Sequence, residues 1–308
     1  MIEANNLAKR YGDKTAVNGL TFTVRPGIVT GFLGPNGAGK STTMRMIVGL
    51  DAPSSGTVRV NGKPYAQHAA PLGEVGIMLE ARAVHTGRSA QDHLLALAAT
   101  HGIGRRRVKE VIDLVGLRQV AKKRAGGFSL GMGQRLGIAS ALLGDPRTVI
   151  LDEPVNGLDP EGVRWVRNLL RGLAAEGRTV FVSSHLMSEM ALTAEHLIVV
   201  GRGEIIADTS VADFIDLASS NTVRVRTPQA TMLHDLIAGP GVSIHSDEPG
   251  VLTVTGLDTD HIGTVAGEHR ITLYELALQR ASLEDAFMQL TADAVEYKAS
   301  TTTERQPA

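Results

Sequence analysis

The stretch "FLGPNGAGKSTTM", residues 32–44, has a spacing of residues that suits the binding of phosphate. Four residues complete the pattern G-x-x-x-x-G-K-[ST] between an apolar run and an expected helix: Gly34, Gly39, Lys40 and Ser41. Backbone N–H groups beside the glycines can point at phosphate oxygens, the lysine can reach the β and γ phosphates, and the serine can ligate Mg²⁺. The pattern predicts a phosphate-holding loop; the alternative is a glycine-rich turn without a ligand.

Three further polar residues follow apolar, strand-like runs. "VILDEP" ends in Asp152 and Glu153, and "VFVSS" is followed by His185. Such strand ends meet at the carboxyl edge of a parallel sheet, where ligands bind. We expect Asp152 to hold Mg²⁺, Glu153 to act as general base on the attacking water, and His185 to contact the γ phosphate. The alternatives are two solvated acids and a structural histidine.

The elements that must position these residues form an α/β pattern. Short half-exposed strands extend from Ile2 to about Val60, and "IVTGFLG" interrupts them as a buried strand. A helical segment follows, with Val108, Val111, Ile112 and Val115 on one face. "TVILDEP" and "TVFVSSH", separated by a helix over Val163–Ala175, are then expected to be parallel strands. The sequence predicts a nucleotide-binding core with an antiparallel β subdomain and a helical subdomain at about residues 82–145.

A second, smaller domain is expected after this core. Beyond Asp208 the order is strand, helix, strand, strand, helix and strand, with helices over Ala230–Ala238 and Thr259–Gly267 and a last strand in "RITLYEL". This order is typical of a ferredoxin-like α+β unit. We therefore predict domains at residues 1–217 and 218–291. The polar residues 292–308 are expected to form a disordered tail.

The composition limits the classes of function. The formal net charge of −1 and the pI near 6.8 provide no excess of positive charge for wrapping nucleic acid. The absence of cysteine excludes disulfides and thiol nucleophiles and suits a reducing compartment. The first residues have no secretory signal pattern, and no run of about 18 apolar residues occurs. We expect a cytoplasmic protein without a nucleic-acid partner, whose work at a membrane needs another chain.

Four motifs in this order give a family resemblance: "GPNGAGKST", "LDEP", "NGLDP" and "SSH". Over about residues 1–215 the chain resembles the ATP-binding subunit of ATP-binding cassette (ABC) transporters. The resemblance implies a P-loop ATPase that uses ATP and Mg²⁺. It also implies nucleotide contacts from further residues of the loop, namely Asn36, Gly37 and Thr42. Tyr11 matches the aromatic residue that stacks on adenine; the alternative is a tyrosine at a strand end without a ligand.

The signature motif of that family is present in altered form as "FSLGMGQR", residues 128–135. The usual order is Leu-Ser-Gly-Gly-Gln, and two registers are possible here. In either register, Gly131 and a helix starting near Met132 can offer backbone N–H groups to a phosphate. The resemblance also implies that Ser129, Gly131 and Asp159 lie at a dimer seam, where one subunit completes the ATP site of the other.

Glu80 stands where the family usually has a glutamine that contacts Mg²⁺. A carboxylate can ligate the ion but brings negative charge toward a triphosphate. Together with the altered signature and the ending "LEDAFMQLT", this residue makes the chain similar to the bacterial drug-resistance and bacitracin-resistance exporters. Glu80 is therefore expected to be a third metal ligand, beside Ser41 and Asp152.

The resemblance favours the energising subunit of a transporter, peripheral at the cytoplasmic face of the cell membrane. It is expected to form a homodimer or a heterodimer and to drive separate multi-span permease subunits. Export of a drug, antibiotic or lipid-like substrate is the preferred direction. The alternatives are an importer subunit and a soluble ABC ATPase acting on ribosomes or DNA. A plain phosphate-loop kinase leaves "FSLGMGQR" and "NGLDP" unexplained.

Overall fold

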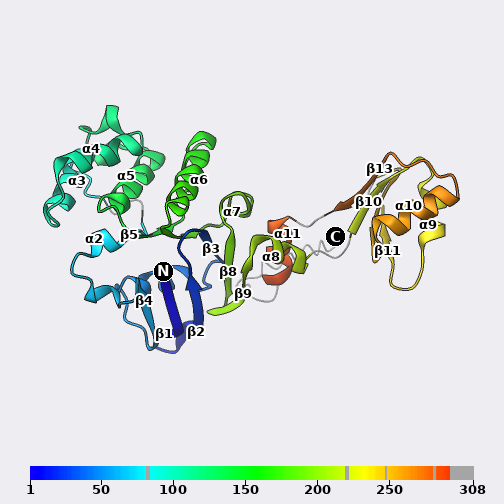
Figure 1. Cartoon of the computed structure of the whole chain (residues 1–308), viewed down its shortest axis with the longest axis horizontal. Helices are drawn as coiled ribbons and strands as arrows, with labels where there is room; N and C mark the ends of the chain where they lie inside the picture. The colour runs from blue at the N-terminus through cyan, green and yellow to red at the C-terminus, as the bar shows by residue number, and fades with distance from the viewer. Residues whose placement is uncertain (81–83, 219–221, 247, 280–281, 292–308) are drawn as a thin grey trace, which may run out of the picture. The chain divides into compact units, whose positions relative to one another are not determined.

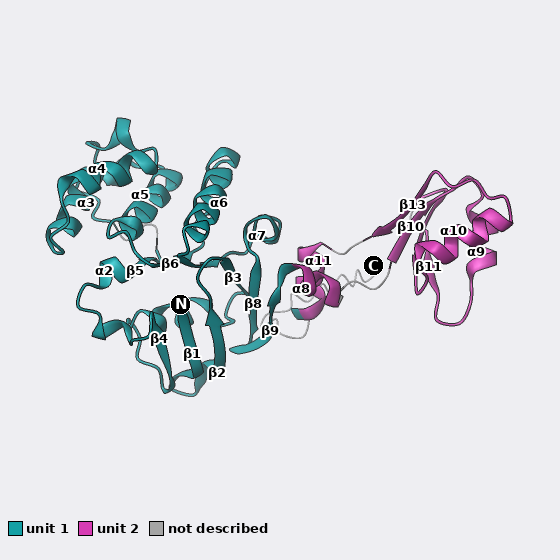
Figure 2. Ribbon diagram, in the orientation of Figure 1, with its two compact units in different colours: residues 1–211, 291–308 teal, residues 212–290 magenta. Residues whose placement is uncertain are grey.

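The computed structural model describes residues 1–80, 84–218, 222–246, 248–279 and 282–291 (Figure 1). The chain divides into two compact units (Figure 2). Unit 1 contains residues 1–211 and Thr291, and unit 2 contains residues 212–290. The predicted tail, residues 292–308, lies outside the described residues, as do residues 81–83 at the predicted start of the helical subdomain.

The first sheet of unit 1 is antiparallel, with strand order β2-β1-β4. Its strands are β1 (Ile2–Tyr11), β2 (Lys14–Val24) and β4 (Ser55–Val60). Alternate residues of β2, such as Leu20, Phe22 and Val24, are buried, and those between them are exposed. This period of two is the expected pattern for a sheet with one covered face, and it confirms the predicted β subdomain.

The second sheet has six strands in the order β5-β6-β7-β3-β8-β9. All its neighbours are parallel except the pair β8 and β9. The strands are β3 (Val29–Leu33), β5 (Val75–Met78), β6 (Thr148–Asp152), β7 (Thr179–Ser183), β8 (His196–Gly201) and β9 (Glu204–Ser210). Unit 1 also has helices α1 (Lys40–Ile47), α2 (Pro71–Glu74), α6 (Pro160–Ala175) and α7 (Met187–Thr193) and a 3₁₀ turn at Tyr65–Gln67. The parallel arrangement brings the ends of β3, β6 and β7 to one edge.

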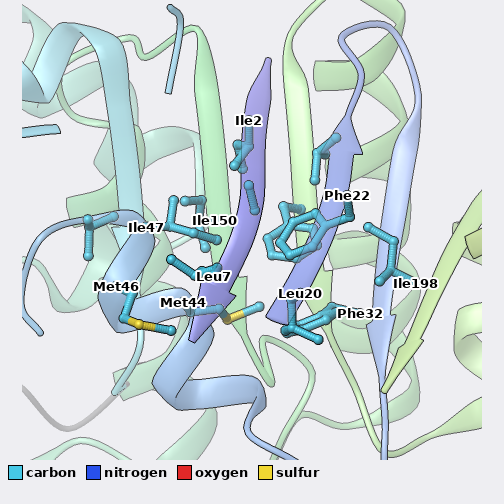
Figure 3. Packing of buried hydrophobic residues seen from close by; sticks show 14 of the residues in the cluster. Ile2, Leu7, Leu20, Phe22, Phe32, Met44, Met46, Ile47, Ile150 and Ile198 are labelled. Atoms are coloured by element: carbon cyan, nitrogen blue, oxygen red, sulfur yellow. The ribbon is translucent and has the colours of Figure 1, made fainter. Parts of the chain in front are cut away.

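An apolar core fills the space between the two sheets (Figure 3). Phe22 comes from the first sheet, and Phe32 and Phe181 come from the second. The ring centroids of Phe32 and Phe181 are 5.0 Å apart, and Phe22 lies 6.0 Å from each. Aromatic pairs at such distances contribute about 0.5–1.5 kcal/mol each beyond their burial. This packing fixes β3, the strand that leads into the glycine-rich loop.

The helical subdomain contains α3 (Ala90–Ala99), α4 (Arg105–Leu114) and α5 (Leu130–Leu142), with 3₁₀ turns at Arg118–Val120 and Ala125–Gly127. The predicted apolar face of α4 is buried, as shown by Val108, Val111 and Ile112. The start of α5, expected near Met132, lies two residues earlier in the chain. The helix begins at Leu130 because the Ser129 side chain caps it, accepting a hydrogen bond from the Met132 N–H at 3.2 Å.

Unit 2 contains a four-stranded antiparallel sheet of order β11-β12-β10-β13. The elements of unit 2 are β10 (Thr222–Arg226), α9 (Ala230–Ile237), β11 (Ser243–His245), β12 (Val251–Thr255), α10 (Thr259–Glu268), β13 (Glu275–Gln279) and all but one terminal residue of α8 (Val211–Ala218) and α11 (Leu283–Thr291). This order does not conflict with the predicted ferredoxin-like unit. Within the described residues, no helix is both long and apolar enough to cross a bilayer.

The predicted last strand of unit 2, "RITLYEL", starts too early. The last strand begins at Glu275, because the preceding residues close the C-terminal end of α10. Arg270 is in the left-handed region with φ 56°, and the Ile271 N–H donates to the Ala266 carbonyl at 2.8 Å. Ile271 is then buried in the core of unit 2.

Candidate functional site

The glycine-rich loop connects β3 to α1 in a conformation that requires glycine at both of its ends. Gly39 is the N-cap of α1 with φ 96°, and a Cβ at this position would collide with the Ala16 carbonyl oxygen. A Cβ at Gly34 would collide with the Val200 carbonyl oxygen. The first turn of α1 carries no acidic residue. Its free N–H groups and positive dipole end therefore suit an anionic ligand such as a phosphate.

Lys40 lies over this loop at the first position of α1. Its Nζ donates to the carbonyl oxygens of Gly34 at 2.6 Å and Pro35 at 3.2 Å. Burial lowers the pKa of Lys40, while the negative charges of Glu153 and Asp152 raise it. The ammonium group thus contacts the loop and is influenced by the charges of both predicted carboxylates.

Ser41 and Asp152 form a pair of oxygen donors at the start of α1 and the end of β6. Ser41 Oγ donates to Asp152 Oδ2 at 2.9 Å. A hydroxyl and a carboxylate are the hard oxygen ligands that Mg²⁺ prefers, and Mg²⁺ commonly uses only one or two protein ligands besides water and phosphates. The donor set therefore fits the predicted ion.

Glu153 follows directly, in a backbone conformation that is rare for a residue with a side chain. Its φ is 51°, and non-glycine residues in the left-handed region cost about 1–3 kcal/mol. Ser183, opposite Asp152 in the parallel register of β6 and β7, contacts both acids. Ser183 Oγ donates to Asp152 Oδ1 and accepts from the Glu153 N–H at 3.0 Å. Gln134 of α5 donates through Nε2 to the Glu153 carbonyl oxygen at 2.6 Å.

His185 lies next to the Glu153 carboxylate, just after β7. Its Nδ1 is 2.7 Å from Glu153 Oε2, and its backbone N–H donates to the same oxygen at 3.4 Å. The His185 side chain is 56% exposed and that of Glu153 is 25% exposed, so a ligand can reach both. The structure thus brings together five of the predicted residues: Lys40, Ser41, Asp152, Glu153 and His185. A carboxylate beside an imidazole is suited to accept a proton from water and to stay oriented while it does so.

Three predicted residues lie instead at two other helix starts. Ser129 caps α5, and Asp159 caps α6 by accepting from the Gly162 N–H at 2.9 Å. Gly131 faces the loop before α6, where a Cβ would lie 3.1 Å from the Gly157 carbonyl oxygen. In the described part of the chain, Ser129 and Asp159 thus contact their own helices, and Gly131 lies close to the loop before α6.

Comparisons with known proteins agree with this site. Residues 17–156 match the family model described as ABC transporter. The chain is 36% identical to an uncharacterised ABC transporter ATP-binding protein, YhcH of Bacillus subtilis, over 96% of this chain and 97% of that protein. It is 34% identical to the bacitracin transport ATP-binding protein BcrA of Bacillus licheniformis, over 94% of this chain and 97% of BcrA. This chain is an ABC transporter ATP-binding subunit.

Solved structures agree with this assignment. A structure described as the ATP-binding subunit of an ABC transporter is 25% identical and has a TM-score of 0.65, covering 70% of this chain and 92% of that one. A dimeric structure of the bacterial ABC transporter cassette MJ0796 is 26% identical and has a TM-score of 0.63, covering 68% and 98% of the two chains. Residues 221–284 match a domain of unknown function. The subunit binds and hydrolyses ATP, and subunits of this family dimerise and work with membrane permeases.

Tyr11 lies at the end of β1 and has an accessible ring. The residue is 49% exposed, and its hydroxyl donates to Asp51 Oδ2 at 3.0 Å. Lys9 Nζ lies 5.0 Å from the ring centroid. The loop residues Asn36 and Gly37 are exposed as well. Tyr11 also interacts with Thr42 of α1, so the predicted stacking and phosphate residues of this ABC subunit belong to adjoining elements.

Glu80 lies two residues beyond the end of β5 and is exposed. The pKa of Arg45 is raised, first by its hydrogen bond to Asp51 and, among smaller causes, by the charge of Glu80. The described residues contain no group of three or more His, Asp or Glu that could hold a metal. Glu80 therefore does not form such a group with Asp152 and Glu153, and its role as a metal ligand stays a prediction.

Sequence reasoning missed Gln134 and Ser183, both of which are buried and contact Glu153. Ser183 was recognisable in principle, because it is the last residue of "TVFVS" and aligns with the last residue of "TVILD" in a parallel pair. Gln134 carries no such signal. Its contact depends on where α5 starts and how α5 packs, and the altered signature left that register open.

Proposed function

We propose that this subunit drives a separate multi-span permease that exports a drug, an antibiotic or a lipid-like compound. The observation that carries this proposal is the similarity to BcrA along nearly the whole of both chains, since BcrA is named for bacitracin transport. Other relatives are named for lantibiotic transport in Streptococcus pyogenes and linearmycin resistance in Bacillus subtilis. The subunit would lie peripherally at the cytoplasmic face of the membrane, where it meets the permease.

The site supports a specific division of labour in ATP hydrolysis. Lys40 and the N–H groups of the loop would hold the β and γ phosphates. Ser41 and Asp152, with Glu80 as a further candidate, would hold Mg²⁺. The ion would neutralise charge on the phosphates. Glu153 would accept the proton of the attacking water, and His185 would keep the Glu153 carboxylate oriented through Oε2 and contact the γ phosphate.

A second copy, or a related subunit, would complete each site. Ser129, Gly131 and Asp159 lie at helix starts, where backbone N–H groups are available to a phosphate. Closure of the dimer on ATP and its opening after hydrolysis would move the attached permease. The dimeric MJ0796 cassette is consistent with this arrangement.

The test is capture of the partner. Tagged Glu153→Gln protein keeps the shape of the side chain but loses the base, so Mg-ATP should trap it in a closed dimer. It would be used to recover partners from detergent-solubilised native membranes, with Lys40→Ala as the matched control that holds nucleotide poorly. We expect a multi-span membrane protein to be recovered with Glu153→Gln and to be depleted in the control.

Other recoveries would favour other functions. Ribosomal or DNA-repair proteins without a membrane chain would replace this proposal by a soluble ABC ATPase. A permease recovered together with an extracellular binding protein would indicate an importer. With the permease in hand, transport of labelled bacitracin-like peptides out of reconstituted vesicles would test the direction and the class of cargo.

A further inference from the structure

The backbone of Glu153 is held on both sides by side chains from other elements. The Glu153 N–H donates to Ser183 of β7, and the Glu153 carbonyl oxygen accepts from Gln134 of α5. Between these two bonds the residue adopts its left-handed φ of 51°. Such a conformation persists only where the surroundings determine it.

We propose that Gln134 is a positioning residue for ATP hydrolysis, which fixes the Glu153 peptide and thereby aims the Glu153 carboxylate. The inference rests on the proposed role of Glu153 as general base. Gln134 is 2% exposed, and its Nε2 lies 2.6 Å from the Glu153 carbonyl oxygen. The same oxygen also accepts from the Asn156 N–H, at the longer distance of 3.3 Å.

The side chain of Gln134 is suited to this task because an amide always has N–H donors. A carboxylate of the same length has none when it is ionised, and an aliphatic side chain has none at all. The bond also joins two parts of unit 1. Gln134 belongs to the helical subdomain, whereas Glu153 extends from the parallel sheet.

The bond therefore couples the position of α5 to the position of the Glu153 carboxylate. Ser129, the cap of α5, lies five positions before Gln134 on the same helix. A displacement of α5 when its N-terminal end engages a phosphate would shift Gln134 and with it the peptide of Glu153. Misplacement of a catalytic group by about 1 Å can lower a rate about 100-fold. Gln134 would in this way link the signature segment to the rate of hydrolysis in its own chain.

The experiment compares catalysis with binding in the full-length protein. Gln134→Met keeps the length of the side chain without a donor, and Gln134→Asn keeps the amide but is too short to reach. The matched control is Ser140→Ala, which removes a side-chain hydrogen bond within α5, to the Leu136 carbonyl, away from Glu153. The readouts are kcat for ATP hydrolysis, Kd for trinitrophenyl-ATP and the melting temperature.

We expect both Gln134 variants to lower kcat by about 10- to 100-fold, with Kd within about twofold of wild type and with Ser140→Ala unchanged. In a Glu153→Gln background, Gln134→Met should have no further effect, because it acts through Glu153. A wild-type kcat in both Gln134 variants, or a loss of kcat matched by the loss of nucleotide binding, would overturn the proposal. Full activity of Glu153→Gln alone would instead overturn the role of Glu153.

Discussion

Ser41 Oγ donates to Asp152 Oδ2 across 2.9 Å, joining the start of α1 to the end of β6. The other oxygen of Asp152 accepts from Ser183. Both carboxylate oxygens are therefore oriented by hydroxyl groups from neighbouring elements. The predicted metal ligand is thus oriented by contacts within the protein.

Ser183→Ala should weaken the response of ATP hydrolysis to Mg²⁺. Loss of the hydroxyl frees one oxygen of Asp152 and removes the acceptor of the Glu153 N–H. Partners of metal ligands typically contribute about 10- to 100-fold to metal affinity or activity. The measurement is the Mg²⁺ concentration that gives half-maximal ATPase activity. Ser184→Ala is the matched control, because Ser184 Oγ binds the Leu186 N–H and neither acid; equal effects of both variants would contradict the prediction.

Tyr11→Leu should weaken ATP binding by about 1–3 kcal/mol, the usual contribution of a base stacked on an aromatic ring. Tyr11→Phe keeps the ring and removes only the hydroxyl that donates to Asp51, so it should bind ATP almost as the wild type does. Equilibrium binding of ATP to the three proteins gives the answer. If Tyr11→Phe lost as much affinity as Tyr11→Leu, the hydroxyl rather than the ring would be the important group.

Glu80→Gln should change the Mg²⁺ dependence of hydrolysis and raise the affinity for ATP, because it removes a negative charge near the expected triphosphate. Parallel titrations of Mg²⁺ and ATP on wild type and variant measure both effects. Glu268→Gln, in α10 of unit 2, controls for the loss of one charge from the chain. Superimposable titration curves for Glu80→Gln and wild type would exclude Glu80 as a metal ligand.

His93 should make the subunit less stable in mild acid. Burial lowers the pKa of His93 below its usual value of 6.5, and the charges of Arg88 and His85 lower it further. Between this lowered pKa and pH 6.5, the unfolded chain binds more protons than the folded chain. The free energy of unfolding is therefore not reduced by this group above pH 6.5. It decreases as the pH falls from 6.5 toward the lowered pKa of His93 in the folded protein.

Denaturant unfolding of wild type and His93→Leu at a series of pH values tests this expectation. The variant lacks the titrating group, so its stability should decrease less steeply below pH 6.5. His93 Nδ1 is buried and has no hydrogen-bond partner among the described residues, so the substitution removes no bond of that atom within this part of the chain. Parallel stability curves for the two proteins would refute the assignment.

Residues that are close in sequence or at strand ends were predictable. The glycine pattern, Asp152 and His185 could be identified because the carboxyl ends of parallel strands gather at one edge, whatever the details of packing. The apolar face of Val108, Val111 and Ile112 likewise required only the helical period.

Features that depend on packing between distant segments were not predictable. The exact start of α5 at Leu130 depends on the cap formed by the Ser129 side chain, and residue type alone does not reveal that cap. The contact of Gln134 with Glu153 requires knowing both that start and the side of α5 that faces the sheet. The left-handed backbone of Glu153 has no signal in its own residue type, since it is imposed by Ser183, Gln134 and the loop that follows.

The close approach of Gly39 to β2, which leaves no room for a side chain, also affects which nucleotides can bind. Gly39 abuts Ala16 of β2, and β2 pairs with β1 up to the partners Tyr11 and Lys14. One hairpin tip therefore supports both the ring proposed to stack on the base and the loop that holds the phosphates. For a nucleotide stacked on Tyr11, this tip would set the distance between the position of the base and the position of the phosphates. Analogues with a shortened or lengthened link between the two should fit one end or the other, but not both.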